Sequence, residues 1–417
     1  MKFIFYGVRL AFWIGLPLMA QQAHVLSLND AITMALNNNP AILAAQKEID
    51  VLEGRILQAG RIQNPELSFT YNEVPTNFSF GVAGEKDIGL SQTIEFPGKR
   101  SARIDIAKHG KAIAELSLAR TKAIITAEVK RAYYQGLLAK EVVSNLKFTI
   151  NLLSDFLKVV TERYQTGASK YLDVIRAKVE LTRLQNDLTE AKREEEVRLG
   201  ELNILLGNVG SLSLILSDSL TVQPLRITQD SAVEFYMARS NFLRIAEMEL
   251  LRNQSLVNLA RTSYLPDFSI GVALQNRPGT ISPAGSSTYF GVSVGVSVPL
   301  WYWQGPKGEV QEAEASLDIS TIRIKAVRLR VQQNILNAFR SASVAQEQLQ
   351  IFDTALLRDT EDELRAGISS YQNNQIDALN LFDIYRTVRA TKIEYARALY
   401  NLLAAQAELE VAGEITQ

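Results

Sequence analysis

Residues 289–298 read Tyr289-Phe290-Gly291-Val292-Ser293-Val294-Gly295-Val296-Ser297-Val298, and they alternate strictly between two kinds of side chain. The even-numbered residues are all large and apolar, whereas the odd-numbered residues are mostly small or polar. Because successive side chains of a strand point to opposite faces, this pattern predicts a β-strand with one apolar face. A length near ten residues is typical of strands that cross an outer membrane. A half-buried strand of a soluble sheet has the same alternation, so this stretch alone leaves both interpretations open.

Other parts of the chain repeat this alternation. It is found in residues 67–71, 88–94 and 268–274. The links between these segments contain the turn-forming residues Pro75, Gly84, Pro278 and Gly279. We therefore predict two β-hairpins. Four strands are too few to close a barrel, and open sheet edges are not stable in lipid, so several chains must share one barrel. Three chains would supply about twelve strands.

Long helices are predicted between and after the strands, because apolar residues recur there at alternating spacings of three and four. The clearest series is Val143, Leu146, Ile150, Leu153, Leu157, Val160 and Tyr164. This spacing places one apolar seam along a helix, as in a coiled coil. The pattern resumes over residues 181–191, after a break near Gly167, which predicts two antiparallel helices packed together. No proline interrupts residues 100–165, so a helix over this stretch would be on the order of 100 Å long.

The sequence is duplicated with an offset of about 200 residues. Asn-Pro-Glu-Leu-Ser-Phe at 64–69 recurs as Leu-Pro-Asp-Phe-Ser-Ile at 265–270. Gly-x-Ser-x-Tyr at 167–171 recurs at 367–371. A repeat of this size indicates two copies of one structural unit. Each copy is predicted to contain, in order, a helix, two strands, a very long helix, a tight break and a second long helix.

The duplication divides the chain into a first structural repeat, residues 27–206, and a second repeat, residues 228–411. Residues 207–227 contain glycine and serine without helical periodicity and are predicted to link the repeats. Residues 412–417 form a C-terminal tail. Residues 1–20 have the features of a secretory signal peptide.

The predicted signal peptide indicates export from the cytoplasm. Lys2 and Arg9 precede a short apolar run, and Ala20 provides a small residue at the cleavage point. An uncleaved anchor is the alternative, although Arg9 and Pro17 interrupt a stretch that is already short for a bilayer. No later run of about eighteen apolar residues predicts a transmembrane helix. The protein is therefore expected in the periplasm, outside the cell, or in an outer membrane.

The composition excludes several classes of function. The 417 residues include 44 Lys plus Arg, 45 Asp plus Glu, two histidines and no cysteine. Without cysteine there is no disulfide, zinc–thiolate site, iron–sulfur cluster or lipid-modified N-terminal cysteine. His24 and His109 are far apart in sequence, so a histidine-built metal centre is not expected. A near-neutral charge offers no basic surface for nucleic acid, and without Walker or catalytic-triad motifs we expect neither an enzyme nor a cofactor.

The chain after the signal peptide resembles the TolC family of outer-membrane efflux proteins. The resemblance rests on the duplicated layout and on the paired breaks Tyr164-x-x-Gly167 and Leu364-x-x-Gly367. In addition, Gln-Thr-Ile-Glu-Phe-Pro-Gly-Lys-Arg at residues 92–100 runs from a strand into the first long helix and is similar to the heavy-metal efflux branch.

The resemblance implies a mainly α fold with a small β part. Each chain would give about four strands to a transmembrane β-barrel shared by a homotrimer, and its long helical hairpins would form an α-barrel in the periplasm. The implied partners are a periplasmic adaptor (membrane fusion) protein, an inner-membrane RND-type pump and outer-membrane lipid. The chain would be a passive conduit in the outer membrane, most simply for heavy-metal cations.

Other functions fit parts of this pattern. A channel for drug efflux or type I protein secretion would have the same layout. A periplasmic coiled-coil adaptor is less favoured, because it should have one hairpin beside a lipoyl-like β-domain and this chain has two in tandem. A secreted structural coiled coil would lack the alternating strands.

The resemblance makes the two breaks the periplasmic tips, where adaptor hairpins dock. The candidate docking residues are Gly167, Ser169, Tyr171, Gly367, Ser369 and Tyr371. The two glycines are expected to have left-handed backbone after a helix end, and Ser169 and Ser369 to cap the next helix.

The resemblance also points to the tunnel entrance, which family members often narrow with acidic rings six and nine residues after the second-repeat glycine. Here those positions hold Asn373 and Ile376, so the double acidic ring is not reproduced. Asp173 lies six residues after Gly167, and Asp377 lies one step beyond Ile376. Asp173, Asn373 and Asp377 are therefore the candidate constriction residues, and three copies of Asp173 would form one electronegative ring that favours cations. Asp173 could instead only complement a helix dipole.

Overall fold

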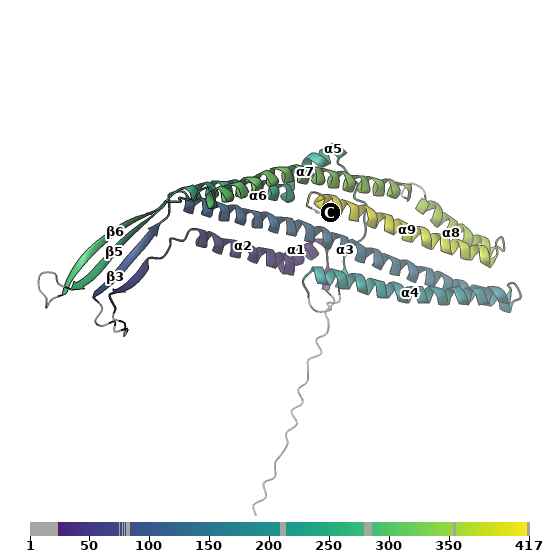
Figure 1. The fold of residues 1–417 in the computed structure, drawn as a ribbon. Helices are drawn as coiled ribbons and strands as arrows, with labels where there is room; N and C mark the ends of the chain where they lie inside the picture. The colour runs from purple at the N-terminus through teal and green to yellow at the C-terminus, as the bar shows by residue number, and fades with distance from the viewer. Residues whose placement is uncertain are drawn as a thin grey trace, which may run out of the picture.

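The structure is a computed structural model that describes residues 24–74, 76, 78, 80, 84–208, 214–278, 286–352 and 356–414. The predicted signal peptide, residues 1–20, lies outside the described residues. The molecule is elongated, with a four-stranded sheet at one end and two helical tips at the other (Figure 1). The expected fold class, mainly α with a small β part, is confirmed.

The sheet contains the four predicted strands. They are β2 (Glu66–Asn72), β3 (Glu85–Ile94), β5 (Asp267–Pro278) and β6 (Ser286–Ser297). All neighbouring pairs are antiparallel, in the order β2-β3-β5-β6. The β3–β5 pairing joins the hairpin of the first repeat to that of the second, so the two hairpins form one continuous sheet.

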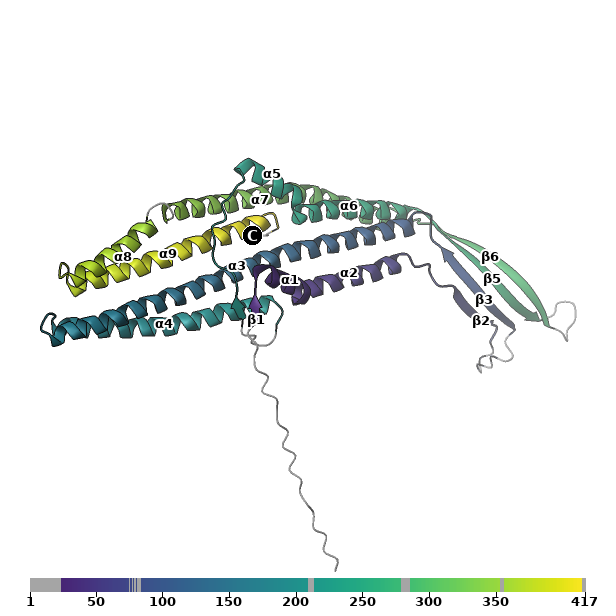
Figure 2. The same cartoon turned by 180° about the vertical axis from the view of Figure 1, so that it is seen from behind.

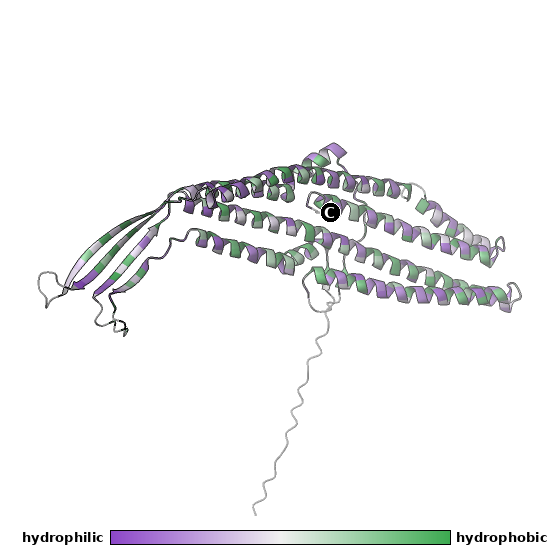
Figure 3. Cartoon of the chain, viewed as in Figure 1, coloured by the Kyte–Doolittle hydropathy of each residue, from purple (hydrophilic) through white to green (hydrophobic). Residues whose placement is uncertain are grey.

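The register gives this sheet two chemically different faces. Leu90, Val272 and Val292 lie side by side on one face, in a surface of exposed apolar side chains. Gly89, Ala273 and Gly291 form the equivalent row on the other face, where side chains are small. The alternation along the strands is visible in Figure 3.

The long helices form two antiparallel hairpins. The first consists of α3 (Lys99–Gln165) and α4 (Tyr171–Leu205). The second consists of α7 (Gly305–Ile351) and α8 (Leu357–Gln372), followed by α9 (Ala378–Val411). The predicted long helix is confirmed, since α3 has 67 residues and is about 100 Å long.

In the second repeat α7 ends at Ile351 and α8 begins at Leu357, whereas the sequence predicted one continuous helix. Phe352 and Leu356 have π-helical geometry on either side of residues 353–355, which the structure does not describe. Beyond this point α8 follows a different direction from α7 (Figure 2). π-Helical geometry commonly accompanies bends in long helices.

Each repeat begins with two helices instead of the single predicted one. These are α1 (Leu28–Asn38) and α2 (Pro40–Ala59) in the first repeat, and α5 (Gln229–Arg239) and α6 (Asn241–Arg261) in the second. The breaks occur where a polar residue starts a new helix: the Asn39 side chain accepts from Ala41 N, and Ser240 accepts from Leu243 N. A 3₁₀ turn, Thr262–Tyr264, leads from α6 to β5.

The helices lie side by side in one curved layer (Figures 1 and 2). Near the sheet the order across the layer is α2, α3, α6, α7, and nearer the tips it is α4, α3, α9, followed by α7 and α8. Within the described residues, α2 and α4 therefore form one lateral edge of the layer, and α7 and α8 form the other, where α5 also packs against α7.

Parts of the predicted linker and tail belong to the packed structure. Leu214–Leu216, within the linker, form strand β4, which pairs in parallel with β1 (His24–Leu26). The buried Tyr133 hydroxyl donates to Leu26 O at 2.9 Å and fixes this pair to α3. In the tail, the buried Glu414 carboxylate accepts from Asn241 N at 2.9 Å, at the start of α6.

Candidate functional site

The turn between α3 and α4 has the backbone expected at the first tip. Gly167 has a φ of +78°, in the left-handed region. Gly167 N donates to Tyr164 O at 3.0 Å, and Ala168 N donates to Arg163 O at 2.7 Å. This pair of bonds closes the end of α3 in a Schellman motif, for which glycine is the favoured residue.

Ser169 does not cap α4, contrary to the prediction. Lys170 is the residue that precedes the helix, and its side chain does not cap it. The Ser169 hydroxyl instead lies 3.4 Å from an Asp173 carboxylate oxygen, because Ser169 is one residue too early to reach the first backbone N–H groups. Tyr171 begins α4 with an exposed ring that contacts Tyr164, with 5.3 Å between ring centres.

The second tip lies after the predicted position. Helix α8 continues through Gly367, Ser369 and Tyr371 and ends at Gln372, so the prediction that these residues form the turn is wrong. The left-handed residue is Asn374, with a φ of 59°. Asparagine is among the few residues other than glycine that adopt this conformation at moderate cost.

The next helix begins with a cap that the sequence analysis assigned to the wrong residue. The carboxylate of Asp377, not Ser369, caps α9 by accepting from Asn380 N at 2.9 Å. Asn373 closes α8, and its N–H donates to Ser369 O. An Asn-Asn pair followed by aspartate three residues later is the sequence signal for this turn, and an alignment of the two repeats on glycine does not detect it.

Gly367 and Tyr371 have packing roles near the second tip. A Cβ atom on Gly367 would lie only 2.6 Å from Cδ1 of Ile384 on α9, so glycine permits the close approach of α8 and α9. Tyr371 is buried, and its ring centre lies 4.9 Å from that of Phe156 on α3. Both residues therefore stabilise the contact between helices near the tip.

The two hairpins are joined near the tips by Arg163, which the sequence analysis did not identify. Its guanidinium donates to Tyr371 O at 2.9 Å and also to the Asn374 side-chain carbonyl. The same guanidinium lies over the Tyr371 ring, 5.1 Å from its centre. A cation at the carboxyl end of α8 also complements the helix dipole.

A second link between the hairpins lies about two helical turns away from the tips. Arg386 on α9 and the largely buried Glu180 on α4 form an ion pair at 3.0 Å. The hydrogen bond from Arg386 lowers the pKa of the Glu180 carboxyl. Tyr385 faces the neighbouring core, and burial raises the pKa of its hydroxyl to about 12. The link therefore holds a carboxylate in its charged form beside a neutral phenol.

The three candidate constriction residues all lie at the tips, at the end of the molecule opposite the sheet. Asp173 is in the first turn of α4 beside the Ser169 hydroxyl, and Asp377 caps α9. Asn373 is exposed at the end of α8. Both aspartates thus have local roles at helix starts, and a ring of Asp173 side chains stays a prediction.

The segment of residues 92–100 forms the junction between the sheet and α3. Gly98 has a φ of +106° where the chain turns from strand to helix. The Lys99 ammonium, with a side chain only 16% exposed, lies 2.8 Å from Asp267 Oδ1 and donates to Leu265 O. Phe96 N donates to the same Asp267 oxygen at 2.8 Å. This conspicuous motif therefore ties the first long helix to the strand that opens the second hairpin.

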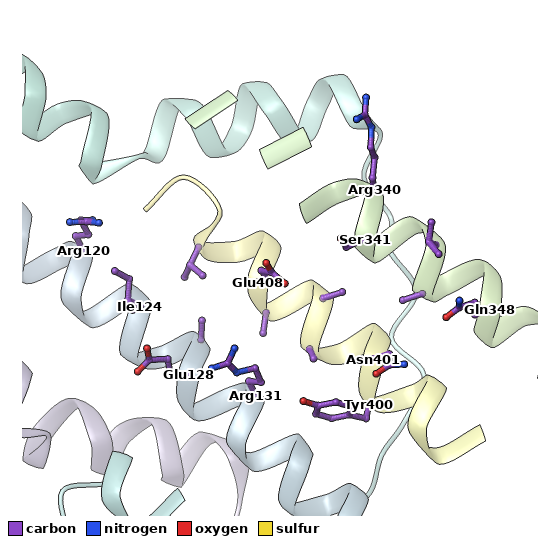
Figure 4. Close-up of a pocket in the computed structure, with 17 residues that line it drawn as sticks. Arg120, Ile124, Glu128, Arg131, Arg340, Ser341, Gln348, Tyr400, Asn401 and Glu408 are labelled. Carbon is purple, nitrogen blue, oxygen red and sulfur yellow. The ribbon is translucent and has the colours of Figure 1, made fainter. Parts of the chain in front are cut away.

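A groove of about 900 Å³ lies farther from the tips, between α3, α7 and α9 (Figure 4). Its lining mixes cations and carboxylates, including Arg131, Arg340, Glu128 and Glu408. Within the residues that the structure describes, no three His, Cys, Asp or Glu side chains group so that they could hold a metal ion. No helix in the described part of the chain is long and apolar enough to cross a membrane.

Comparisons with known proteins agree on one family. The model of the family described as outer membrane efflux protein matches residues 31–208 and again residues 236–412. The cobalt-zinc-cadmium resistance protein CzcC of Cupriavidus metallidurans is 25% identical over 379 residues, which cover 91% of this chain and 88% of CzcC. The pyoverdine export outer membrane protein OpmQ of Pseudomonas putida is 23% identical, with 76% of this chain and 68% of OpmQ covered.

Solved structures have the same fold. Structures of CusC superpose with a TM-score of 0.75 at 16% identity, covering 93% of this chain and 91% of that chain. The Campylobacter jejuni CmeC outer membrane channel also has a TM-score of 0.75 at 16% identity, with coverage of 93% and 85%. The double match of the family model spans most of both repeats. The chain therefore belongs to the outer membrane efflux protein family.

Proposed function

We propose that this chain is the outer-membrane channel of a tripartite efflux system and that three copies form one conduit, which passively exports heavy-metal cations. The observation that carries the proposal is the pair of open edges, which run along the whole molecule. When identical copies close into a ring, the unpaired backbone groups of the sheet edges and the exposed sides of the helices find partners.

The edges of the sheet and of the helical layer correspond. Strand β2 and helices α2 and α4 form one side, and strand β6 with helices α7 and α8 forms the other. A neighbouring copy that pairs its β6 with β2 therefore also brings its long helices to the open helical edge. Three copies give about twelve strands, a number found in closed membrane barrels.

The two faces of the sheet fit opposite surroundings in such a barrel. The apolar face, which includes Val272 and Val292, suits lipid, since every spanning strand of a membrane barrel presents apolar residues outward. The face with Gly89, Ala273 and Gly291 leaves space along the inside. A conduit needs no catalytic group in this chain, and the family consists of channel proteins and not enzymes.

The proposed cargo follows from relatives. CzcC, a cobalt-zinc-cadmium resistance protein, matches 91% of this chain. The alternative, a drug or other organic substrate, has weaker support from OpmQ and from the toxin and drug export protein A of Aggregatibacter actinomycetemcomitans, which is 18% identical. Heavy-metal cations are therefore the first choice of cargo.

The tips are the proposed contact with a periplasmic adaptor, through which an RND-type pump in the inner membrane would deliver the cargo. Both turns lie at the end of the molecule opposite the sheet (Figure 1). Tyr171, Leu172 and Ile175 leave an exposed apolar surface at the first tip, which suits packing by a partner helix. At the second tip the corresponding turn consists of residues 373–377, in place of the predicted Gly367 turn.

The test is the susceptibility of the source bacterium after deletion of the gene, with complementation by wild type and by Asp173→Asn. Sensitivity to metals that wild type reverses supports the proposed cargo. Sensitivity only to dyes, detergents or antibiotics would support the channel function but contradict heavy-metal cations as its cargo. Full resistance with Asp173→Asn would contradict a role for an Asp173 ring in cation passage.

A further inference from the structure

The face of the sheet that lacks large apolar side chains changes along the strands. On β3, β5 and β6, three successive rows of this face contain only glycine, alanine, serine and threonine. With increasing distance from the helices, these rows are Thr93, Ser269 and Gly295, then Ser91, Gly271 and Ser293, then Gly89, Ala273 and Gly291.

The next row on this face has larger polar side chains. It consists of Asp87, Gln275 and Tyr289, with Thr70 beside Asp87 on β2. These four residues are named the collar. In the proposed barrel this face points inward, so the bore narrows at the collar.

Asp87 carries the only charge in the collar, and the described chain does not neutralise it. Its Oδ1 atom is shielded from solvent and has no hydrogen-bond partner among the described residues. The following row differs, because Glu85 and Arg277 lie 3.5 Å apart and the Asn72 side chain also donates to Glu85 at 3.2 Å. A shielded carboxylate oxygen without a partner is rare in native structures and is explained most simply by an ion or water that completes it.

The chemistry around Asp87 suits a cation that passes without being held. The collar adds an amide and two hydroxyl groups to the carboxylate, and oxygen atoms of these kinds attract hydrated cations. Within the part of the chain that the structure describes, no three His, Cys, Asp or Glu side chains gather into a tight metal site. Conduction requires this weaker kind of contact, because an ion must leave as readily as it enters.

We propose that Asp87 is a specificity-determining residue of the conduit, at which three carboxylates favour cations over anions inside the barrel. Three-fold symmetry would place the three Asp87 side chains at one level, and rings of aspartate produce this preference in cation channels. The proposal rests on the trimeric conduit of the proposed function. It adds a selective level at the sheet end of the molecule, separate from Asp173 at the tips.

Thiol labelling tests the proposal, because the natural chain has no cysteine. Ala273→Cys introduces one thiol on the inward face, one row nearer the helices than the collar. Intact cells receive either a cationic or an anionic methanethiosulfonate of similar size, which must pass the collar to reach this thiol from outside. The measured quantity is the cationic rate divided by the anionic rate, normalised to the same ratio for free cysteine. This ratio cancels any change in the reactivity of the thiol itself.

The normalised ratio should exceed one at low ionic strength when Asp87 is present. Asp87→Asn keeps the shape of the side chain and removes the charge, and it should lower the ratio at least about threefold, because the bore lies within a Debye length of the three carboxylates. Asp87→Lys should bring the ratio below one. Added salt should reduce both differences.

A matched control removes the same charge far from the sheet. Glu234 is exposed on α5, which packs against α7, and Glu234→Gln should leave the ratio unchanged. A neutral methanethiosulfonate should label Ala273→Cys at one rate in all variants, which verifies that the bore has formed. If Asp87→Asn fails to assemble, Asp87→Ser repeats the comparison with a side chain that the neighbouring rows already contain.

An unchanged ratio in Asp87→Asn, with normal neutral labelling, would overturn the role of Asp87 and leave the conduit intact. An equal fall in Glu234→Gln would also overturn it, because the effect would come from the overall charge of the protein. If no reagent labels Ala273→Cys in protein that is present in the outer membrane, the inward orientation of this face is wrong. That result would overturn the proposed barrel together with the collar.

Discussion

Arg163, in the last turn of α3, donates to the carbonyl of Tyr371 at 2.9 Å while its guanidinium lies over the Tyr371 ring. These two residues belong to different repeats, 208 positions apart. One side chain thus fastens the end of the first hairpin to the end of the second. This contact holds the two tips together along with the Glu180–Arg386 pair and the packing of Tyr371 against Phe156.

Arg163→Ala should separate the tips and lower local stability. The change removes charged hydrogen bonds to the end of α8, each worth about 1.5–3 kcal/mol. Spin labels on cysteines placed at Thr166 and Gln375 report the distance between tips, and the natural chain has no cysteine to interfere. The distance distribution should broaden in the variant. Arg365→Ala, at an exposed arginine that pairs with Asp362 on its own helix, is the control and should leave the distribution unchanged.

Gly367→Ala should destabilise the second hairpin, because the new methyl group meets Cδ1 of Ile384. Overpacking of this kind costs about 1–3 kcal/mol. Thermal unfolding followed by circular dichroism measures the change. Adding Ile384→Val removes the opposing Cδ1 atom and should restore most of the loss.

Gly54→Ala, in α2, is the control for Gly367→Ala. Among the described residues no atom lies within 4 Å of the position of its new Cβ. Alanine favours the helix there by about 1 kcal/mol. Equal effects at positions 54 and 367 would show that Gly367 does not mediate close packing.

The Glu180–Arg386 pair should make stability depend on acid. Arg386 lowers the pKa of Glu180 in the folded protein below its ordinary value of 4.5. The charged pair therefore contributes its full stabilisation above pH 4.5 and loses it as the pH falls through the lowered folded-state pKa. Wild type should unfold at higher denaturant concentration than Glu180→Gln at pH 7, and this difference should shrink as the pH falls below 4.5. Glu190→Gln, at an exposed pair with Arg193, should show little difference at either pH.

Lys99→Met should weaken the sheet–helix junction. It leaves the Asp267 carboxylate without its cation and Leu265 O without a donor, at a cost of about 1–3 kcal/mol. We expect fewer folded trimers in the outer membrane, with metal resistance falling only in proportion to trimer number. Arg100→Met changes the exposed neighbour and should have no effect. Full trimer yield with lost resistance in Lys99→Met would instead indicate contact between this motif and the cargo.

The sequence was sufficient to predict elements in which a regular spacing of apolar residues continues over many residues. The alternation at 289–298 predicted β6, and the seam from Val143 to Tyr164 predicted the distal part of α3. The left-handed residue at Gly167 was also predictable, because glycine after a helical seam has few other interpretations. In each case one local rule was enough.

Features that depend on tertiary contacts were missed. Three-residue strands such as β1 and β4 are too short to show a period, and their pairing depends on the buried Tyr133. The sequence predicted the second tip at Gly367. In the structure, Asn374 has the left-handed conformation there, and Gly367 instead permits close packing of two helices. In the sequence, Arg163 has no feature that distinguishes it from other arginines on helix surfaces. Its role depends on the end of α8, which only the fold brings beside it.

The central claim, that open edges of three chains close into one conduit, is tested most directly by crosslinking β2 to β6. Leu67→Cys and Val296→Cys are introduced together, and a short bifunctional maleimide is added to cells. Within one chain β2 and β6 are separated by two strands, about 14 Å apart at ordinary strand spacing, so a shorter reagent should join only different chains. The account predicts covalent dimers and trimers in the outer membrane and no larger species. Monomers alone, or a ladder that extends beyond the trimer, would contradict it.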